Sequence, residues 1–316
     1  MSSVRGKRTL RISEAARTIF YTPLLATVAA GFLHKEGLSG TLGPISKGIE
    51  RLRLLNEGEI HVIGNTPTLS FLWLERGEQN LPPQVAAMNH RDGFYIVSRE
   101  PREDFRWTDL EEASLVSSSF SLQPWASLRF CLAEQGGVDY RKIKLIGDFP
   151  TMTDAEQAFR GGTGDYAHLQ EPLASRLEED GVGHIVASVG QAQGPIAFST
   201  LAMSREFLTE EGEVAEAFMR AYYATLRWLV DSDAETIVDA VKPLFPDTAK
   251  SALVRSVEGY KSIGAWLPDP VISKASYERM VEMWIFAGHM TKRYRYGDVV
   301  HSDLAERVIT RDRDEM

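Results

Sequence analysis

Residues 9–38 read TLRISEAARTIFYTPLLATVAAGFLHKEGL and combine a strand pattern with a helix pattern. Polar and apolar residues alternate over residues 9–13, which is typical of a strand. Over residues 22–32 a threonine precedes a proline, and apolar residues continue as far as Gly31. A threonine cap followed by proline is typical of a helix start, and glycine is typical of a helix end. The stretch therefore predicts a strand followed by a helix.

The same order continues along the next part of the chain. Residues 46–55 carry apolar side chains at helical spacing, and residues 60–64 form the next apolar strand pattern. Strands that alternate with helices predict a parallel sheet with right-handed crossovers. Further strand patterns occur at residues 84–88, 93–98, 115–117, 142–146, 166–169 and 184–187. After residue 201 the patterns are almost entirely helical.

We predict an α/β protein with two lobes, parallel or mixed sheets and a helical C-terminal third. Residues 9–95 would form the first part of lobe 1, residues 96–196 would form lobe 2, and residues 197–316 would return to lobe 1. Extended segments near residues 94–97 and 195–200 would join the lobes. Open α/β sheets bind ligands beyond the carboxyl ends of their strands. The functional residues should therefore follow strands and face a cleft between the lobes.

Composition and charge exclude several classes of partner. The 316 residues include 35 basic and 44 acidic side chains, which gives a net charge of -9. Such a balance argues against nucleic-acid binding and against a polybasic membrane-binding surface. Cys131 is the single cysteine, so neither an intrachain disulfide nor a thiolate metal cluster can form. We expect no metal and no cofactor.

The beginning of the sequence bears on localisation. Residues 1–8 read MSSVRGKR and are not followed by an apolar segment typical of a signal peptide. The most hydrophobic early stretch, residues 19–33, is interrupted by Pro23 and falls short of the ~20 residues of a membrane span. As written, the chain is predicted to be cytoplasmic, without direct membrane insertion. The alternative is a periplasmic protein whose export signal is missing from this sequence.

Four segments together resemble a known family. They are FYTPL followed by AGFLHKEGL, LNEGEIHV, WTDL followed by LVSS, and GDYAHLQEP, at residues 20–38, 55–62, 107–118 and 164–172. In this order they resemble the sulfonate, nitrate, taurine and thiamine-precursor substrate-binding proteins of ABC transporters, which have the type 2 periplasmic-binding fold. The match spans roughly residues 10–208. One departure is His61, which stands where the family usually has aspartate.

The resemblance implies a protein that captures a small anionic or heteroaromatic solute between two lobes and delivers it to an ABC permease. Some relatives with the same fold are enzymes. The thiamine-pyrimidine synthases need a cysteine-rich motif, and the aromatic sulfinate desulfinases need a nucleophilic cysteine near the first strand. Cys131 provides neither, since it stands alone in a predicted helix. Two alternatives remain open: an enzyme acting on an aromatic or pyrimidine-like substrate, and a ligand sensor without a signal peptide.

Candidate ligand-binding residues in lobe 1 follow the predicted strands. Phe20 and Tyr21 could stack on a planar ligand, although Phe20 could equally pack in the core. Arg17 could hold a carboxylate or sulfonate through two parallel hydrogen bonds. Thr66 precedes a proline after a strand, so it could contact a ligand or simply cap a helix.

Candidate residues in lobe 2 follow two further strands. Ser118 and Ser119 are expected to open a helix, where an anion is favoured by the helix dipole, although they could be ordinary caps. His168 and Glu171 are expected after a strand, where they could bind ligand or, in the enzyme alternative, act as an acid/base pair. The pair could instead contribute to a metal site, or have a purely structural role. We predict that Tyr21, Thr66, Ser118 and Glu171 share one cavity.

Overall fold

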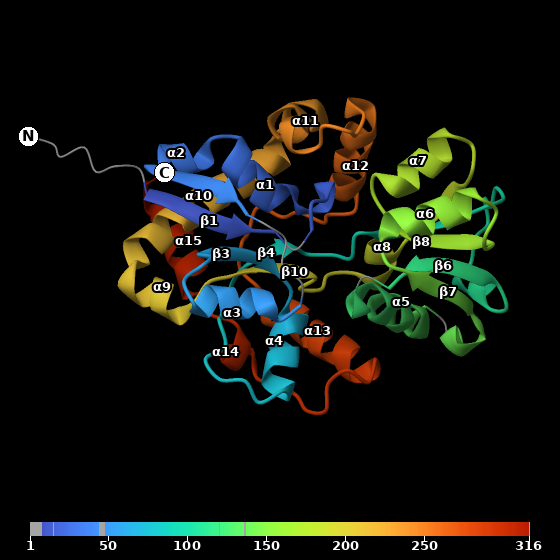
Figure 1. Ribbon diagram of the computed structural model, residues 1–316, viewed down its shortest axis with the longest axis horizontal. Helices are drawn as coiled ribbons and strands as arrows, with labels where there is room; N and C mark the ends of the chain where they lie inside the picture. The colour runs from blue at the N-terminus through green and yellow to red at the C-terminus, as the bar shows by residue number, and fades with distance from the viewer. Residues whose placement is uncertain (1–7, 15, 44–47, 120, 136, 316) are drawn as a thin grey trace, which may run out of the picture.

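The computed structural model describes the chain at residues 8–14, 16–43, 48–119, 121–135 and 137–315. Within these residues, ten strands form two separate five-stranded sheets, and helices surround each sheet (Figure 1). We call each sheet with its surrounding helices a lobe. The predicted two-lobed α/β fold is therefore confirmed. Residues 1–7, and the first two residues of the helix predicted at 46–55, lie outside the described residues.

The sheet of the first lobe has the strand order β2-β1-β3-β10-β4. Its strands are β1 (Arg8–Ser13), β2 (Leu38–Leu42), β3 (Val62–Asn65), β4 (Gln84–Asn89) and β10 (Ser199–Ala202). Strand β1 runs parallel to β2 and β3, as the strand–helix alternation predicts. Strand β10 returns from the second lobe and runs antiparallel to both β3 and β4, so the sheet is mixed.

The sheet of the second lobe has the strand order β7-β6-β8-β5-β9. Its strands are β5 (Phe94–Ser98), β6 (Ser114–Ser118), β7 (Lys144–Phe149), β8 (Tyr166–Gln170) and β9 (His184–Ser188). Strand β6 runs parallel to β7 and β8, whereas β5 runs antiparallel to β8 and β9. In each sheet, therefore, a strand that crosses over from the other lobe runs against its neighbours.

Helices fill the remaining parts of both lobes. The second lobe contains α5 (Leu122–Glu134), α6 (Met152–Arg160), α7 (Leu173–Glu179) and α8 (Val189–Gln193). Before the crossing, the first lobe contains α1 (Thr22–Ala29), α2 (Phe32–Lys35), α3 (Glu50–Asn56) and α4 (Pro67–Glu75). After the crossing follow α9 (Arg205–Glu210), α10 (Gly212–Asp231), α11 (Ala234–Val241), α12 (Lys250–Ser262), α13 (Lys274–Phe286), α14 (Tyr296–Val299) and α15 (Asp303–Glu315). Short 3-10 helices lie at Ile19–Tyr21, Trp107–Leu110, Tyr140–Lys142 and Lys242–Leu244.

Helix α10 shows how the C-terminal third joins the first sheet. Its buried side chains Phe218, Tyr222 and Leu226 recur every four residues, so they form one apolar stripe along the helix. The Tyr222 hydroxyl also donates a hydrogen bond of 2.7 Å to the carbonyl oxygen of Ala87 in β4. Helix α10 is thereby packed against β4, which lies more than a hundred residues earlier in the chain.

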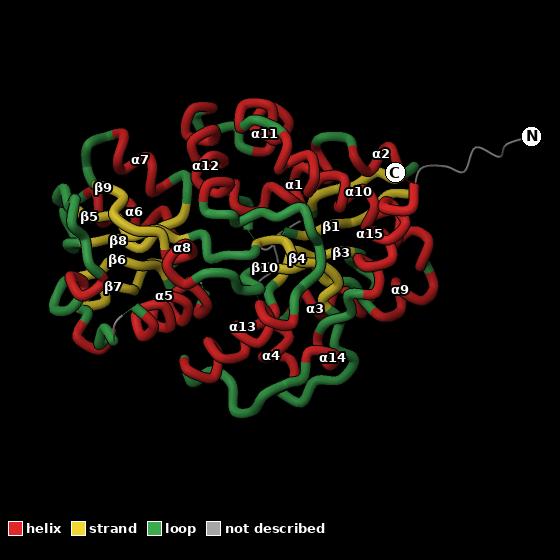
Figure 2. Tube along the Cα trace, turned by 180° about the vertical axis from the view of Figure 1, so that it is seen from behind, coloured by secondary structure: helices red, strands yellow, loops and turns green. Residues whose placement is uncertain are grey.

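The two lobes are joined by two short crossing segments. The chain leaves β4 through residues 90–93 to enter β5, and it returns through residues 194–198 to enter β10 (Figure 2). Two helices of the C-terminal third lie against the second lobe, because α12 contacts α7 and α13 contacts α5. The first lobe therefore touches the second on both sides of the crossing segments, and this arrangement frames the space between them.

Candidate functional site

A cavity of about 460 Å³ lies between the lobes. Its size falls within the range of roughly 300 to 1,000 Å³ that is usual for small-molecule sites. The first lobe contributes Ala16, Thr18, Tyr21, Gly48, Arg51, Thr66, Thr68, Leu69, Leu72 and Trp284. The second lobe and the return crossing contribute Phe94, Ser121, Leu122, Gln123, Pro124, Pro150, Thr151, Met152, Gln170 and Phe198. Both lobes thus supply walls, as the predicted cleft requires.

Two helix N-termini from opposite lobes face this cavity. Thr66 caps α4, and its Oγ1 accepts a hydrogen bond of 3.0 Å from the backbone N–H of Thr68. Ser121 caps α5, and its Oγ accepts a hydrogen bond of 3.4 Å from the backbone N–H of Gln123. The first turn of a helix carries a partial positive charge and favours nearby anions. The cavity therefore has positive potential from both sides.

Arg51 on α3 adds a full positive charge to the cavity wall. Arg51 is 6% exposed, and its Nη1 donates a 2.9 Å hydrogen bond to the Gly64 carbonyl. Its Nε is buried and has no hydrogen-bond partner among the residues that the structure describes. Among the described residues, Arg51 forms no ion pair with an acidic side chain. Burial lowers the pKa of Arg51, although an arginine stays protonated in proteins. The cleft thus holds a buried cation with no acidic side chain paired to it in the described part of the chain.

The rest of the wall is mainly apolar. Leu69, Leu72, Leu122 and Met152 line the cavity, and Phe94 and Trp284 also belong to its wall. Phe94 and Trp284 are each 1% exposed and present little surface, whereas Leu122 is 54% exposed. Such a surface suits an aromatic or aliphatic group. The whole site can therefore hold a molecule that has an anionic group at one end and an apolar body.

Two of the eight predicted ligand-binding residues, Tyr21 and Thr66, line this cavity. Tyr21 lies beside Arg51, and its hydroxyl interacts with Ser199; burial raises the pKa of Tyr21. Thr66 has the predicted position between a strand and a helix with proline at its first turn. Both residues therefore lie at the cavity, and their role in binding stays a prediction.

Phe20 and Arg17 lie near the same strand end but do not line the cavity. Phe20 is fully buried, and its ring packs 4.9 Å from Tyr260 and 5.7 Å from Phe198, measured between ring centroids. It is therefore a core residue, which was the alternative interpretation. Arg17 forms a salt bridge with the buried Glu14, so its guanidinium is held by a protein carboxylate.

Ser118 and Ser119 do not open a helix, so this expectation was wrong. Ser118 is the last residue of β6, and Ser119 follows it with its backbone N–H and its hydroxyl both directed to the Phe149 carbonyl. Helix α5 begins three residues later, and Ser121 is its cap. The predicted helix N-terminus does exist at the cleft, but a different serine provides it.

His168 lies within β8 and not after it, which corrects the predicted position. Its ring packs 4.5 Å from Phe94, and its Nδ1 lies 3.3 Å from the Ser117 hydroxyl. Burial lowers the pKa of His168 to about 3, so the imidazole is neutral at physiological pH. The side chain does not line the cavity and is a buried core residue of the second sheet.

Glu171 follows β8 as predicted, but its carboxylate is directed to Ser175 in the next helix, α7. Its carboxylate accepts hydrogen bonds from the backbone N–H of Ser175, at 3.0 Å, and from the Ser175 hydroxyl, at 2.7 Å. Burial raises the pKa of Glu171. The predicted meeting of Tyr21, Thr66, Ser118 and Glu171 is thus only half fulfilled, since the last two lie outside the cavity lining.

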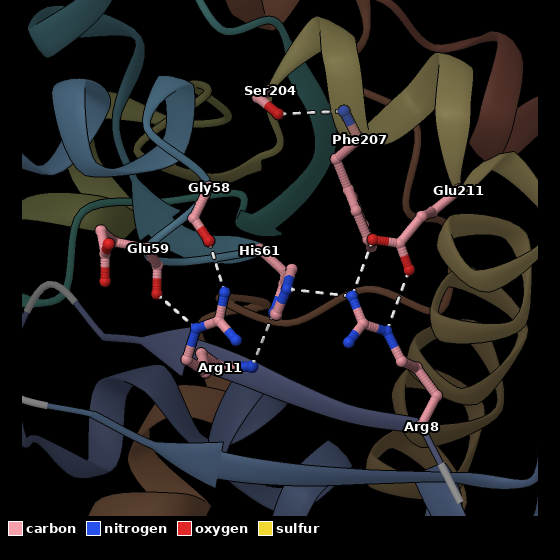
Figure 3. A network of polar contacts seen from close by, with 8 residues as sticks. All are labelled: Arg8, Arg11, Gly58, Glu59, His61, Ser204, Phe207 and Glu211. Carbon is pink, nitrogen blue, oxygen red and sulfur yellow. Dashed lines mark hydrogen bonds and ion pairs between the residues drawn. The ribbon is translucent and has the colours of Figure 1, made fainter. Parts of the chain in front are cut away.

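A smaller cavity of about 220 Å³ lies on the first lobe beside α9 (Figure 3). Arg8 pairs there with Glu211 through two hydrogen bonds of 2.7 and 2.9 Å. His61 accepts the backbone N–H of Arg11 at its Nδ1, and the Arg11 guanidinium donates to the backbone carbonyls of Gly58 and Glu59. These contacts tie β1 to the segment before β3, so His61 has a structural role at this position.

The fold matches that of two-lobed substrate-binding proteins. Solved structures with this fold include SsuA from Xanthomonas axonopodis bound to MOPS (17% identity, 95% of this chain and 100% of that chain, TM-score 0.70). They also include the nitrate-binding protein NrtA from Synechocystis (13% identity, 96% and 89%, TM-score 0.69) and DSZB in complex with biphenyl-2-sulfinic acid (12% identity, 96% and 99%, TM-score 0.71). The predicted fold is confirmed, and it occurs in binding proteins and in a desulfurization enzyme.

One particular relative agrees with this class. The chain is 28% identical over 302 residues to a Bacillus subtilis protein named "Putative binding protein YtlA", which covers 95% of this chain and 89% of the relative. No protein-family model matches the chain. In the described part of the structure, none of the helices has the length and apolar character needed to cross a membrane.

Proposed function

We propose that this protein binds one small solute in the interlobe cavity and serves as the substrate-binding component of an ABC-type importer. The observation that carries the proposal is the buried Arg51, which faces a cavity between two lobes without an acidic partner among the described residues. A buried charge without a counter-ion costs several kcal/mol, and a bound anion offsets that cost. The relatives named above support a binding role through their printed names.

The solute is a small anion with an apolar or aromatic body. Its anionic group would lie against Arg51 and the first turn of α4 at Thr66 and Thr68. Its apolar part would lie against Leu72, Leu122 and Met152. Movement of the lobes about residues 90–93 and 194–198 would admit the solute. Closure would then exclude water and strengthen each polar contact.

Binding without turnover is the favoured form of this proposal. The enzyme alternative assigned acid/base roles to His168 and Glu171, and neither residue lines the cavity. The single cysteine, Cys131, is fully buried, and burial raises its pKa, so it is a poor nucleophile. In the importer role, the protein would pass its solute to a permease. It would therefore bind the solute on the outer side of the membrane that the permease spans.

The test is a thermal-shift screen followed by calorimetry. Alkyl and aryl sulfonates, carboxylates including phthalate, and pyrimidines are the compounds to compare. We expect at least one organic anion to raise the melting temperature. For that compound, Arg51→Gln should weaken binding by about 10- to 100-fold, which corresponds to ~1.4 to 2.8 kcal/mol. The loss follows because the amide keeps a donor but removes the charge.

Arg53→Gln is the matched control for this test. Arg53 lies on the same helix two residues away, but it is exposed and pairs with Glu78 at 2.7 Å. The control removes the same charge without touching the cavity, so its affinity should stay within about twofold of the parent. Equal binding by the Arg51→Gln variant would contradict the assigned anion site, and chemical conversion of the bound compound would establish an enzyme.

A further inference from the structure

Gln123 connects three parts of the molecule at the cavity wall. It lies in the first turn of α5, in the second lobe, and is 4% exposed. Its Oε1 accepts hydrogen bonds from the hydroxyls of Thr66, at 2.6 Å, and Thr68, at 3.1 Å, which belong to the first lobe. Its Nε2 donates a 2.8 Å hydrogen bond to the carbonyl of Phe198, in the return crossing.

The orientation of this amide is fixed by its partners. The Phe198 carbonyl can only accept, so it must face the amide nitrogen of Gln123. The amide oxygen is then left for Thr66 and Thr68. These two hydroxyls also lie within hydrogen-bond distance of each other, and each has one proton to donate. At least one of the two protons is therefore engaged with Gln123, across the cleft, before a solute arrives.

We infer that Gln123 is an interlobe clasp that holds the solute cavity in its narrow form and sets how far the lobes open. The inference deepens the proposed binding function and rests on it, because a clasp matters only where a solute enters. A solute oxygen that accepts from these hydroxyls competes with Gln123 for their two protons. Solute entry and release of the clasp are thus coupled through the same two hydroxyl groups.

Two of the other polar contacts between the lobes are ion pairs. Arg279 pairs with Glu134 at 2.7 and 3.1 Å, and Arg255 forms an ion pair with Glu179. The pairing side chains are between 31% and 41% exposed, and ion pairs at such positions contribute little. Gln123 is buried, so water cannot replace its partners as easily. Its removal should therefore loosen the lobes more than the loss of a peripheral pair.

The test measures the distance between the lobes in the protein without solute. Cysteines are introduced at Arg76, at the end of α4, and at Gln157, on α6; both positions are exposed and lie in different lobes. Cys131 is fully buried, so spin labels attach to the new cysteines only. Pulsed electron paramagnetic resonance then gives the distribution of label distances. We expect Gln123→Ala to add a population at longer distance.

Gln193→Ala is the matched control. Gln193 is also 4% exposed, and its Oε1 accepts from Ser127, but both residues belong to the second lobe. The inference stands if Gln123→Ala shifts the distances and Gln193→Ala does not. It is overturned if neither variant shifts them, or if both do. Should Gln123→Ala fail to fold, Thr68→Val removes one partner from the other lobe and must give a smaller shift in the same direction. Because no solute is used, a failed compound screen leaves this result intact.

Discussion

Gly190→Ala should lower the free energy of unfolding by about 3 to 5 kcal/mol, an effect expected only where a side chain overlaps fixed atoms. A Cβ atom at Gly190, in α8, would lie 2.0 Å from the carbonyl oxygen of Asp92. The backbone of the first crossing segment cannot rotate away as a side chain can, so α8 or the crossing must move. Arg91 fixes the same contact, since its Nη1 donates to the Gly190 carbonyl at 3.1 Å.

Gly212→Ala provides the comparison. Gly212 begins α10, its φ is not positive, and no atom lies within 4 Å of an added Cβ. Alanine favours a helix over glycine by up to ~1 kcal/mol, so this variant should be as stable as the parent or slightly more stable. Chemical denaturation followed by circular dichroism measures both. If Gly190→Ala unfolds within 1 kcal/mol of the parent, the crossing segment is not packed as tightly as the structure indicates.

Element order and fold class follow from local patterns. The C-terminal third is largely helical, as predicted, and α10 and α11 each bury an apolar stripe with a helical period. The antiparallel placement of β10 and β5 could not be read in this way. Their short apolar runs are the same in either direction, and pairing is decided by the crossing segments that bring each strand from the other lobe.

The cavity-lining residues were harder to predict than the fold. Arg51 and Arg53 stand two residues apart on one helix, and only packing shows that the first is buried and the second exposed. Ser118, Ser119 and Ser121 are chemically alike, and the end of β6 decides which of them caps α5. The sequence around Gln123 does not indicate its role, because that role depends on partners 55 to 75 residues away in the chain.

Asp92 should make this protein less stable as the pH rises, which is the reverse of the usual effect of an aspartate. The side chain is fully buried in the first crossing segment, where its Oδ1 accepts the Phe94 N–H at 2.7 Å, and Ser127 is a second hydrogen-bond partner. Burial raises the pKa of Asp92 from 3.8 to about 7. The folded protein therefore keeps a proton that the unfolded chain releases near pH 4. This contribution to stability is present at low pH and is lost as the pH rises through about 7.

Asp92→Asn isolates this contribution, because the amide keeps the acceptor for Phe94 and never ionises. A pKa difference of about three units corresponds to ~4 kcal/mol, so the variant should gain up to that amount over the parent between pH 4 and pH 8. His90 and His168 oppose the trend in both proteins. Burial lowers their pKa values to about 4 and about 3, and this costs stability as the pH falls below 6.5. The unfolding free energies of both proteins are measured across this range, and their difference removes the contribution of the histidines. A difference that does not change with pH would show that Asp92 is ionised in the folded protein.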